Sequence, residues 1–173
     1  MRRDVRDLLS KNKPALLERW FDIVLETYPP GSSGFLKDKK GQFANPVGYT
    51  ISRGLGELLD ELLQEREMEI EKISAVLDSI IRIRAVQDVN PSQALAFLFR
   101  LKSVLREELA GSAIVPAGEI EALESRIDAM ALISFDLFMK CREKIYDLKA
   151  SELRNMTFRL LQKAKLVSEM PGQ

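Results

Sequence analysis

Residues 119–167 read EIEALESRIDAMALISFDLFMKCREKIYDLKASELRNMTFRLLQKAKLV and contain neither proline nor glycine. Nothing in this stretch interrupts a helix, because proline and glycine are the two residues that a helix interior disfavours most strongly. At a rise of about 1.5 Å per residue, one continuous helix would reach roughly 75 Å, well beyond the diameter of the domain that the rest of the chain forms. We therefore expect an all-α protein, a multi-helix bundle with a long C-terminal helix.

The first half of this stretch carries a seam of apolar and small residues at alternating steps of three and four. Its members are Ile120, Leu123, Ile127, Met130, Ser134, Leu137 and Cys141. Such spacing is typical of paired helices, so we expect a homodimer that forms through the C-terminal helix. Beyond Cys141 the spacing drifts, and a regular coiled coil to the end is not expected. A break near residues 147–152 would instead fold the tail back onto the bundle.

Helical periodicity also runs through the rest of the chain, and two helix starts use the same device. In Asn45-Pro46 and Asn90-Pro91, the asparagine can accept a hydrogen bond from a first-turn amide, and proline fits the first helical position. The helix predicted from about residue 46 to residue 64 contains three glycines, Gly48, Gly54 and Gly56. We interpret them as sites of close helix contact; the alternative is a gap that admits a ligand.

Breaks in this pattern suggest how the chain is organised. We expect a helical domain over residues 1–110 and a C-terminal helical extension over residues 111–173, which packs on that domain, dimerises, or does both. Taken together they form one domain, as 173 residues allow. The connection over residues 29–44 holds glycine, serine and lysine; it is expected to be an ordered surface crossover, with a binding lid as the alternative.

Composition excludes several classes of protein. The 26 basic and 26 acidic side chains balance, so no global field attracts nucleic acid or an anionic membrane. Histidine is absent, and with it the commonest general base, the commonest zinc ligand and the usual proximal ligand of haem. We therefore expect a protein that is not an enzyme, with no catalytic residue, no metal site and no cofactor.

The single cysteine and the absence of a long apolar run bear on location. Cys141 excludes an intramolecular disulfide, and its apolar helical context favours a buried thiol over a redox sensor or nucleophile. No stretch approaches the roughly 20 apolar residues of a membrane span, and no signal peptide opens the sequence. The expected location is the cytoplasm, with no membrane partner.

Polar residues continue the apolar stripe of the helix predicted from about residue 68 to residue 89. Arg84, Gln87 and Asp88 lie in line with Ile80 and Ile81, and Gln93 of the next helix comes close to them. Arg84 and Asp88 can pair along the helix, since they are four residues apart. A satisfied structural network that ties the two helices together is one interpretation; the other is the polar end of a ligand or partner pocket.

Several segments together resemble a known family. They are Trp20, Thr27-Tyr28-Pro29, Phe43-Ala44-Asn45-Pro46-Val47-Gly48, Ile80-Ile81-Arg82-Ile83-Arg84-Ala85-Val86-Gln87-Asp88 and Asn90-Pro91-Ser92-Gln93-Ala94. The pattern, over roughly residues 8–108, resembles the N-terminal domain of RsbRD-type proteins, the RsbT co-antagonists. The resemblance implies a helical sensory input that is joined to a phosphorylatable STAS output domain within the stressosome, a cytoplasmic assembly that restrains the kinase RsbT.

This sequence departs from that arrangement after Glu108, where only further helix follows and no alternating strand pattern of a STAS domain occurs. The resemblance therefore implies an input module that stands alone and signals by association. It transfers no catalytic residue. The candidates for a ligand site, a partner site or a structural polar network are Arg82, Arg84, Gln87, Asp88 and Gln93, and the further family-pattern positions are Trp20, Tyr28, Asn45, Pro46, Pro91 and Ser92.

We expect a non-catalytic signalling or regulatory input module that acts through protein–protein contacts. The alternative is a small-molecule binding protein, with an apolar or acidic ligand, or an accessory factor of a metabolic or redox complex. In that case the glycine-bearing helix, the Arg84 neighbourhood and the 29–44 crossover would form the pocket. The protein partner, beyond a second copy of the chain, is not disclosed by the residues.

Overall fold

Six helices make up the described part of the chain, which is residues 2–28, 36, 43–87, 89–110 and 115–164 of a computed structural model. They are α1 (Arg3–Lys11), α2 (Lys13–Leu25), α4 (Pro46–Leu62), α5 (Ile70–Ala85), α6 (Pro91–Ala110) and α7 (Ala117–Lys163). No strand occurs among these residues, and the predicted all-α bundle is confirmed. Most of the 29–44 connection lies outside the described residues, so neither interpretation of it is tested.

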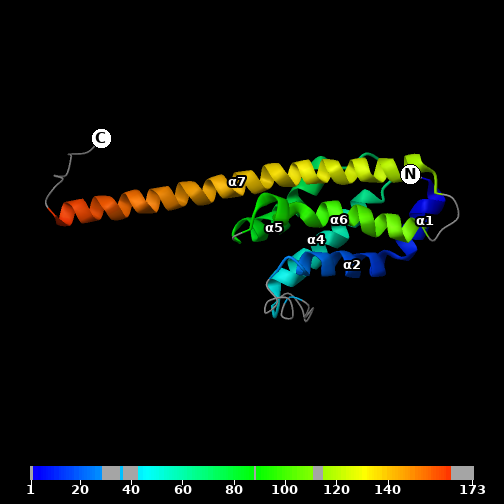
Figure 1. The fold of residues 1–173 in the computed structure, drawn as a ribbon, viewed down its shortest axis with the longest axis horizontal. Coiled ribbons are helices and arrows are strands. Elements are labelled where there is room, and N and C mark those ends of the chain that lie inside the picture. Colours follow the sequence, from blue (N-terminus) through cyan, green and yellow to red (C-terminus); the bar gives the residue numbers. More distant parts are fainter. Residues whose placement is uncertain (1, 29–35, 37–42, 88, 111–114, 165–173) are drawn as a thin grey trace.

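The long C-terminal helix is continuous. α7 begins after Pro116, runs through residues 147–152 without a break and ends at Lys163. Figure 1 shows its orange and red end extending well beyond the other helices, while its yellow half lies along them. The tail is therefore not folded back onto the bundle.

The first half of α7 belongs to the core of its own subunit. Leu123, Ile127, Met130, Ser134 and Phe138 are all buried, where α7 packs against α5 and α6. The seam that we expected to pair two copies of the chain thus packs within one subunit, and that assignment is wrong. The spacing of three and four indicates that helices pair, but it does not distinguish a neighbouring helix of the same chain from a helix of another copy.

The other side of the core forms where α2 packs between α4 and α6. Trp20 of α2 is fully buried, and its indole N–H donates to the carbonyl oxygen of Phe97 over 2.9 Å. The Trp20 and Phe97 rings lie with centroids 6.1 Å apart. Such a residue combines a large apolar surface with one satisfied polar atom, so it fixes how α2 sits on α6.

The start of α4 shows why its sequence contains asparagine and glycine. Asn45 accepts a hydrogen bond from the Gly48 amide over 2.8 Å and donates to the Leu36 carbonyl over 2.9 Å. A Cβ atom at Gly48 would lie 2.3 Å from the Asn45 amide nitrogen. At Gly54, a Cβ atom would lie 2.8 Å from the end of Ile80, so this glycine lets α4 and α5 approach closely, as expected.

A buried carboxylate joins α4 to the start of α5. Glu61 accepts from the Glu69 amide over 3.1 Å, from Lys72 over 3.0 Å and from Arg66 over 3.2 Å. Burial alone would raise the pKa of Glu61, but the Glu69 and Lys72 hydrogen bonds and the charges of Arg66 and Lys72 outweigh it, so its pKa lies below the ordinary 4.5. The ionised form of Glu61 therefore stabilises the fold.

Glu61→Gln is expected to lower the free energy of unfolding by about 1–3 kcal/mol at neutral pH, because the hydrogen bonds to a charged acceptor are lost. A lowered folded-state pKa means that this stabilisation is present above pH 4.5 and is lost as the pH falls through the folded value. Urea unfolding of the wild type and the variant at several pH values measures the difference, which should shrink below pH 4.5.

Glu67→Gln is the matched control, because Glu67 lies in the same connection with its side chain exposed. It should leave stability nearly unchanged at every pH. A Glu61→Gln difference that stays constant from neutral to acidic pH would contradict the assignment.

Candidate functional site

The polar corner, defined here as Tyr28, Arg84, Gln87 and Gln93, lies where α5 ends and α6 begins. Arg84 is only 1% exposed although it carries a charge. Its guanidinium donates to the Gln87 side chain over 3.4 Å and to the Gln93 carbonyl oxygen over 3.2 Å. Gln93 in turn accepts a hydrogen bond from the Asn90 amide over 3.1 Å, which closes the turn between the helices.

Tyr28, which follows α2, completes this corner from a distant part of the chain. The Arg84 guanidinium carbon lies 4.9 Å from the centroid of the Tyr28 ring, a cation–π distance. Two buried polar atoms find no hydrogen-bond partner among the described residues: Nε of Arg84 and the hydroxyl of Tyr28. A buried donor that stays unpaired costs free energy, so the network at the corner is incomplete within the described part of the chain.

The sequence candidates are thus only partly brought together. Arg84, Gln87 and Gln93 meet, as their spacing predicts. Arg82 points to another face, where it is exposed and pairs with Asp78 over 2.6 Å. Asp88 lies outside the described residues, so its expected pairing with Arg84 is not tested.

The family-pattern positions divide into three groups, of which the first is Tyr28 in the polar corner. Trp20, Asn45 and Pro46 hold the fold, as a core anchor and as the start of α4. Pro91 and Ser92 open α6 and line an apolar groove that is described below.

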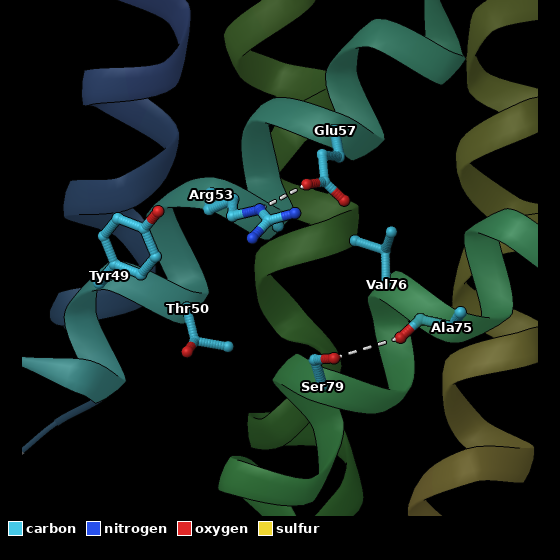
Figure 2. Close-up of a pocket in the computed structure, with 8 residues that line it drawn as sticks. Tyr49, Thr50, Arg53, Glu57, Ala75, Val76 and Ser79 are labelled. Carbon is cyan, nitrogen blue, oxygen red and sulfur yellow. Dashed lines mark hydrogen bonds and ion pairs between the residues drawn. The ribbon is translucent and has the colours of Figure 1, made fainter. Parts of the chain in front are cut away.

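A cleft of about 370 Å³ lies between α4 and α5, and Figure 2 shows its side chains. It is lined by Tyr49, Thr50, Arg53, Gly54, Glu57, Ala75, Val76 and Ser79. Arg53 donates to Glu57 over 2.7 Å, a contact that raises the pKa of Arg53, and Ser79 donates to the Ala75 carbonyl over 3.2 Å. Arg53 and Glu57 thus pair with each other, while Ser79 bonds to the backbone of its own helix.

A larger and more apolar groove, of about 660 Å³, lies between the start of α6 and the middle of α7. We call it the α6–α7 groove; its lining is Pro91, Ser92, Leu95, Phe99, Asp128, Ala131, Leu132 and Phe135. Phe99, Leu132 and Phe135 are large apolar side chains that are at least 48% exposed. Phe99 and Leu132 lie on helices that are rich in apolar residues, so the sequence alone does not mark them as exposed.

The groove continues into a stripe of exposed apolar side chains along α7. This α7 stripe consists of Leu132, Phe135, Met139, Tyr146, Leu153, Met156 and Leu160. Arg142 and Lys149 occupy the two intermediate positions, so the steps alternate between three and four from end to end. The signal was present in the sequence as a second seam, offset from the buried one.

Beyond Arg142, α7 has no buried residue at all. Residues 143–163, which we call the α7 arm, are exposed or half-exposed throughout, and Leu153 is 64% exposed. Arg142 marks the point of departure, because its guanidinium donates to the Ala85 carbonyl at the end of α5 over 3.3 Å. The same guanidinium donates to the Tyr146 hydroxyl over 2.9 Å and lies 5.1 Å from the Tyr146 ring centroid.

Cys141 lies just before this point and is half-buried. Burial raises the pKa of the Cys141 thiol and the carboxylate of Asp78 raises it further, against the opposing charges of Arg82 and Lys144. A raised pKa keeps the thiol protonated at neutral pH, and a protonated thiol is a poor nucleophile.

Arg84→Met separates a structural role from a functional one. We expect it to leave the free energy of unfolding unchanged or to raise it, because methionine keeps much of the volume while a buried charge with an unsatisfied N–H is removed. Chemical unfolding followed by circular dichroism measures this. Ile80→Ala, in the adjacent core, should by contrast cost about 2–4 kcal/mol. A loss above about 2 kcal/mol for Arg84→Met would show that the arginine holds the fold.

Of three comparisons with known proteins, only the one against family models gives a match. Searches of curated proteins and of solved structures found no match. None of the described helices combines the length and apolarity that crossing a bilayer requires. The family model described as the RsbT co-antagonist protein rsbRD N-terminal domain matches residues 14–153, which run from α2 to the first part of the α7 arm and leave out α1. The chain therefore belongs to the RsbRD N-terminal domain family.

Proposed function

We propose that this protein is a regulatory input module whose signal leaves through protein contacts made by the α7 stripe. The family supports the first half of the proposal, since it is one of stressosome-type regulatory input domains. The second half is supported by one observation: the α7 arm leaves the bundle and carries large apolar side chains into solvent.

Such an arm is costly unless something covers it. Tyr146, Leu153, Met156 and Leu160 are each more than half exposed on a helix with no other helix beside it in Figure 1. Contiguous exposed apolar surface marks interaction sites, and most of the stability of a helix in a protein comes from packing of its apolar face. We propose that the first partner is a second copy of the chain, so that the module is a homodimer through α7.

Contacts between the polar corner and the α7 arm could transmit a change at the corner to the arm. Arg84 lies next to Ala85, whose carbonyl receives the hydrogen bond from Arg142. Arg142 in turn contacts Tyr146, the first stripe residue of the arm. A ligand or partner that paired with the unsatisfied atoms of Arg84 and Tyr28 would act on the helix end that positions the arm. We propose this corner as the place where the stimulus acts.

Met156→Glu is expected to weaken self-association by more than about tenfold, because each dimer would carry two charges in its apolar seam. Sedimentation velocity over a concentration series measures the monomer–dimer equilibrium. The melting temperature of the bundle should not fall, since Met156 is more than half exposed and has no role in the core.

Asn155→Glu is the control, because it places the same charge on the same exposed part of the helix but off the stripe. It should dimerise like the wild type. A wild type that stays monomeric at its highest soluble concentration, or equal effects of the two substitutions, would refute self-association through the stripe.

A further inference from the structure

We propose that the two α7 helices pair antiparallel, so that the end of the α7 arm of each copy lies against the α6–α7 groove of the other, and the rest of the arm lies along the partner's α7. The inference rests on the proposed self-association and adds the orientation and the seat of the partner. Three observations carry it: the length of the stripe, the basic residues within it and the charges beside it.

Together with its basic positions Arg142, Lys149 and Lys163, the stripe keeps its three–four spacing from Leu132 to Lys163, with four positions on the bundle and six on the arm. An antiparallel pair that overlaps over this whole length brings the bundle positions of each copy against the end of its partner's arm. Phe135 then lies opposite Leu160, Met139 opposite Met156, Arg142 opposite Leu153, and Tyr146 opposite Lys149. Leu160 at the end of the arm thereby covers the Phe135 side of the groove, which stays exposed in a single copy.

The basic residues of the stripe disfavour the parallel arrangement. In a parallel, in-register pair, Arg142, Lys149 and Lys163 would each meet their own copy across the seam. Like charges held that close repel, and burying them without a counter-charge is costly. In the antiparallel pair each meets an apolar or aromatic side chain instead, and Lys149 can lie on the partner's Tyr146 ring.

Charges beside the stripe act in the same direction. Residues 147–163 contain four basic side chains, Lys149, Arg154, Arg159 and Lys163, against two acidic ones, Asp147 and Glu152. On the bundle, Asp136 is exposed next to Phe135, and Asp128 lines the groove. Asp128 also pairs with Lys102 over 2.6 Å, but a carboxylate has room for a second cation. Antiparallel pairing brings Lys163 within about one helical turn of the partner's Asp128. The basic end of the arm is then attracted to the carboxylates beside the groove.

A distance between spin labels distinguishes the two orientations. The label is attached to Gln162→Cys in a Cys141→Ser background, at a position off the stripe. In the antiparallel pair the two labels lie about 45 Å apart, from 29 residues of axial offset at about 1.5 Å each. A parallel pair gives less than roughly 20 Å, the width of two adjacent helices with their side chains. A short distance would overturn antiparallel pairing but would leave the proposed dimer standing. The absence of dipolar coupling would overturn both the antiparallel pairing and the dimer.

A charge-pair experiment tests the same contact without labels. Phe135→Glu and Leu160→Lys, both at exposed positions, should each weaken the dimer. The double variant should recover about tenfold of the summed loss, because the introduced carboxylate faces the introduced ammonium group only in the antiparallel pair. In a parallel pair the double variant places like charges together, and its loss would be at least the sum of the single losses.

Discussion

The helix α7 has no proline or glycine in its interior and continues past the surface on which it packs, and this feature shapes the whole molecule. Between Glu119 and Lys163 nothing ends α7, and it outgrows the bundle beneath it. Its first half is buried against α5 and α6, while residues 143–163 have no buried member. The first half of α7 is therefore a core element, and its second half is an exposed apolar surface. Such a helix is suited to transmit a conformational change of the bundle to a partner.

The junction between these halves is the chemically unusual part of the fold. Arg84 is buried with one N–H unpaired, and the next residue, Ala85, accepts the hydrogen bond from Arg142. Most buried polar groups in proteins are satisfied, and this incomplete network next to the departure point of the arm is the reason why we propose the corner as the place where the stimulus acts. In the cleft between α4 and α5, in contrast, Arg53 pairs with Glu57, and Ser79 bonds to the backbone of its own helix.

The sequence predicts the helices well because their signals are local. Asparagine with proline marks the start of α4, and the absence of breakers predicts the length of α7. Pairing is different, because the seam from Ile120 to Cys141 looks alike whether its partner is α5 or another molecule. The meeting of Arg84 with Gln93 follows from their spacing, but the contribution of Tyr28 depends on how α2 packs. Likewise the α7 stripe becomes visible only once the other face of α7 is known to be buried.

Hydrogen exchange of the two halves of α7, measured over a range of protein concentrations, tests most directly the claim that one half is core and the other awaits a partner. Amides of residues 120–141 should exchange slowly at every concentration, because they open only with the bundle. Amides of residues 145–163 should exchange fast in dilute solution and more slowly as the concentration rises, when a second copy covers them. Slow exchange of the arm at all concentrations, or fast exchange at all of them, would contradict the account.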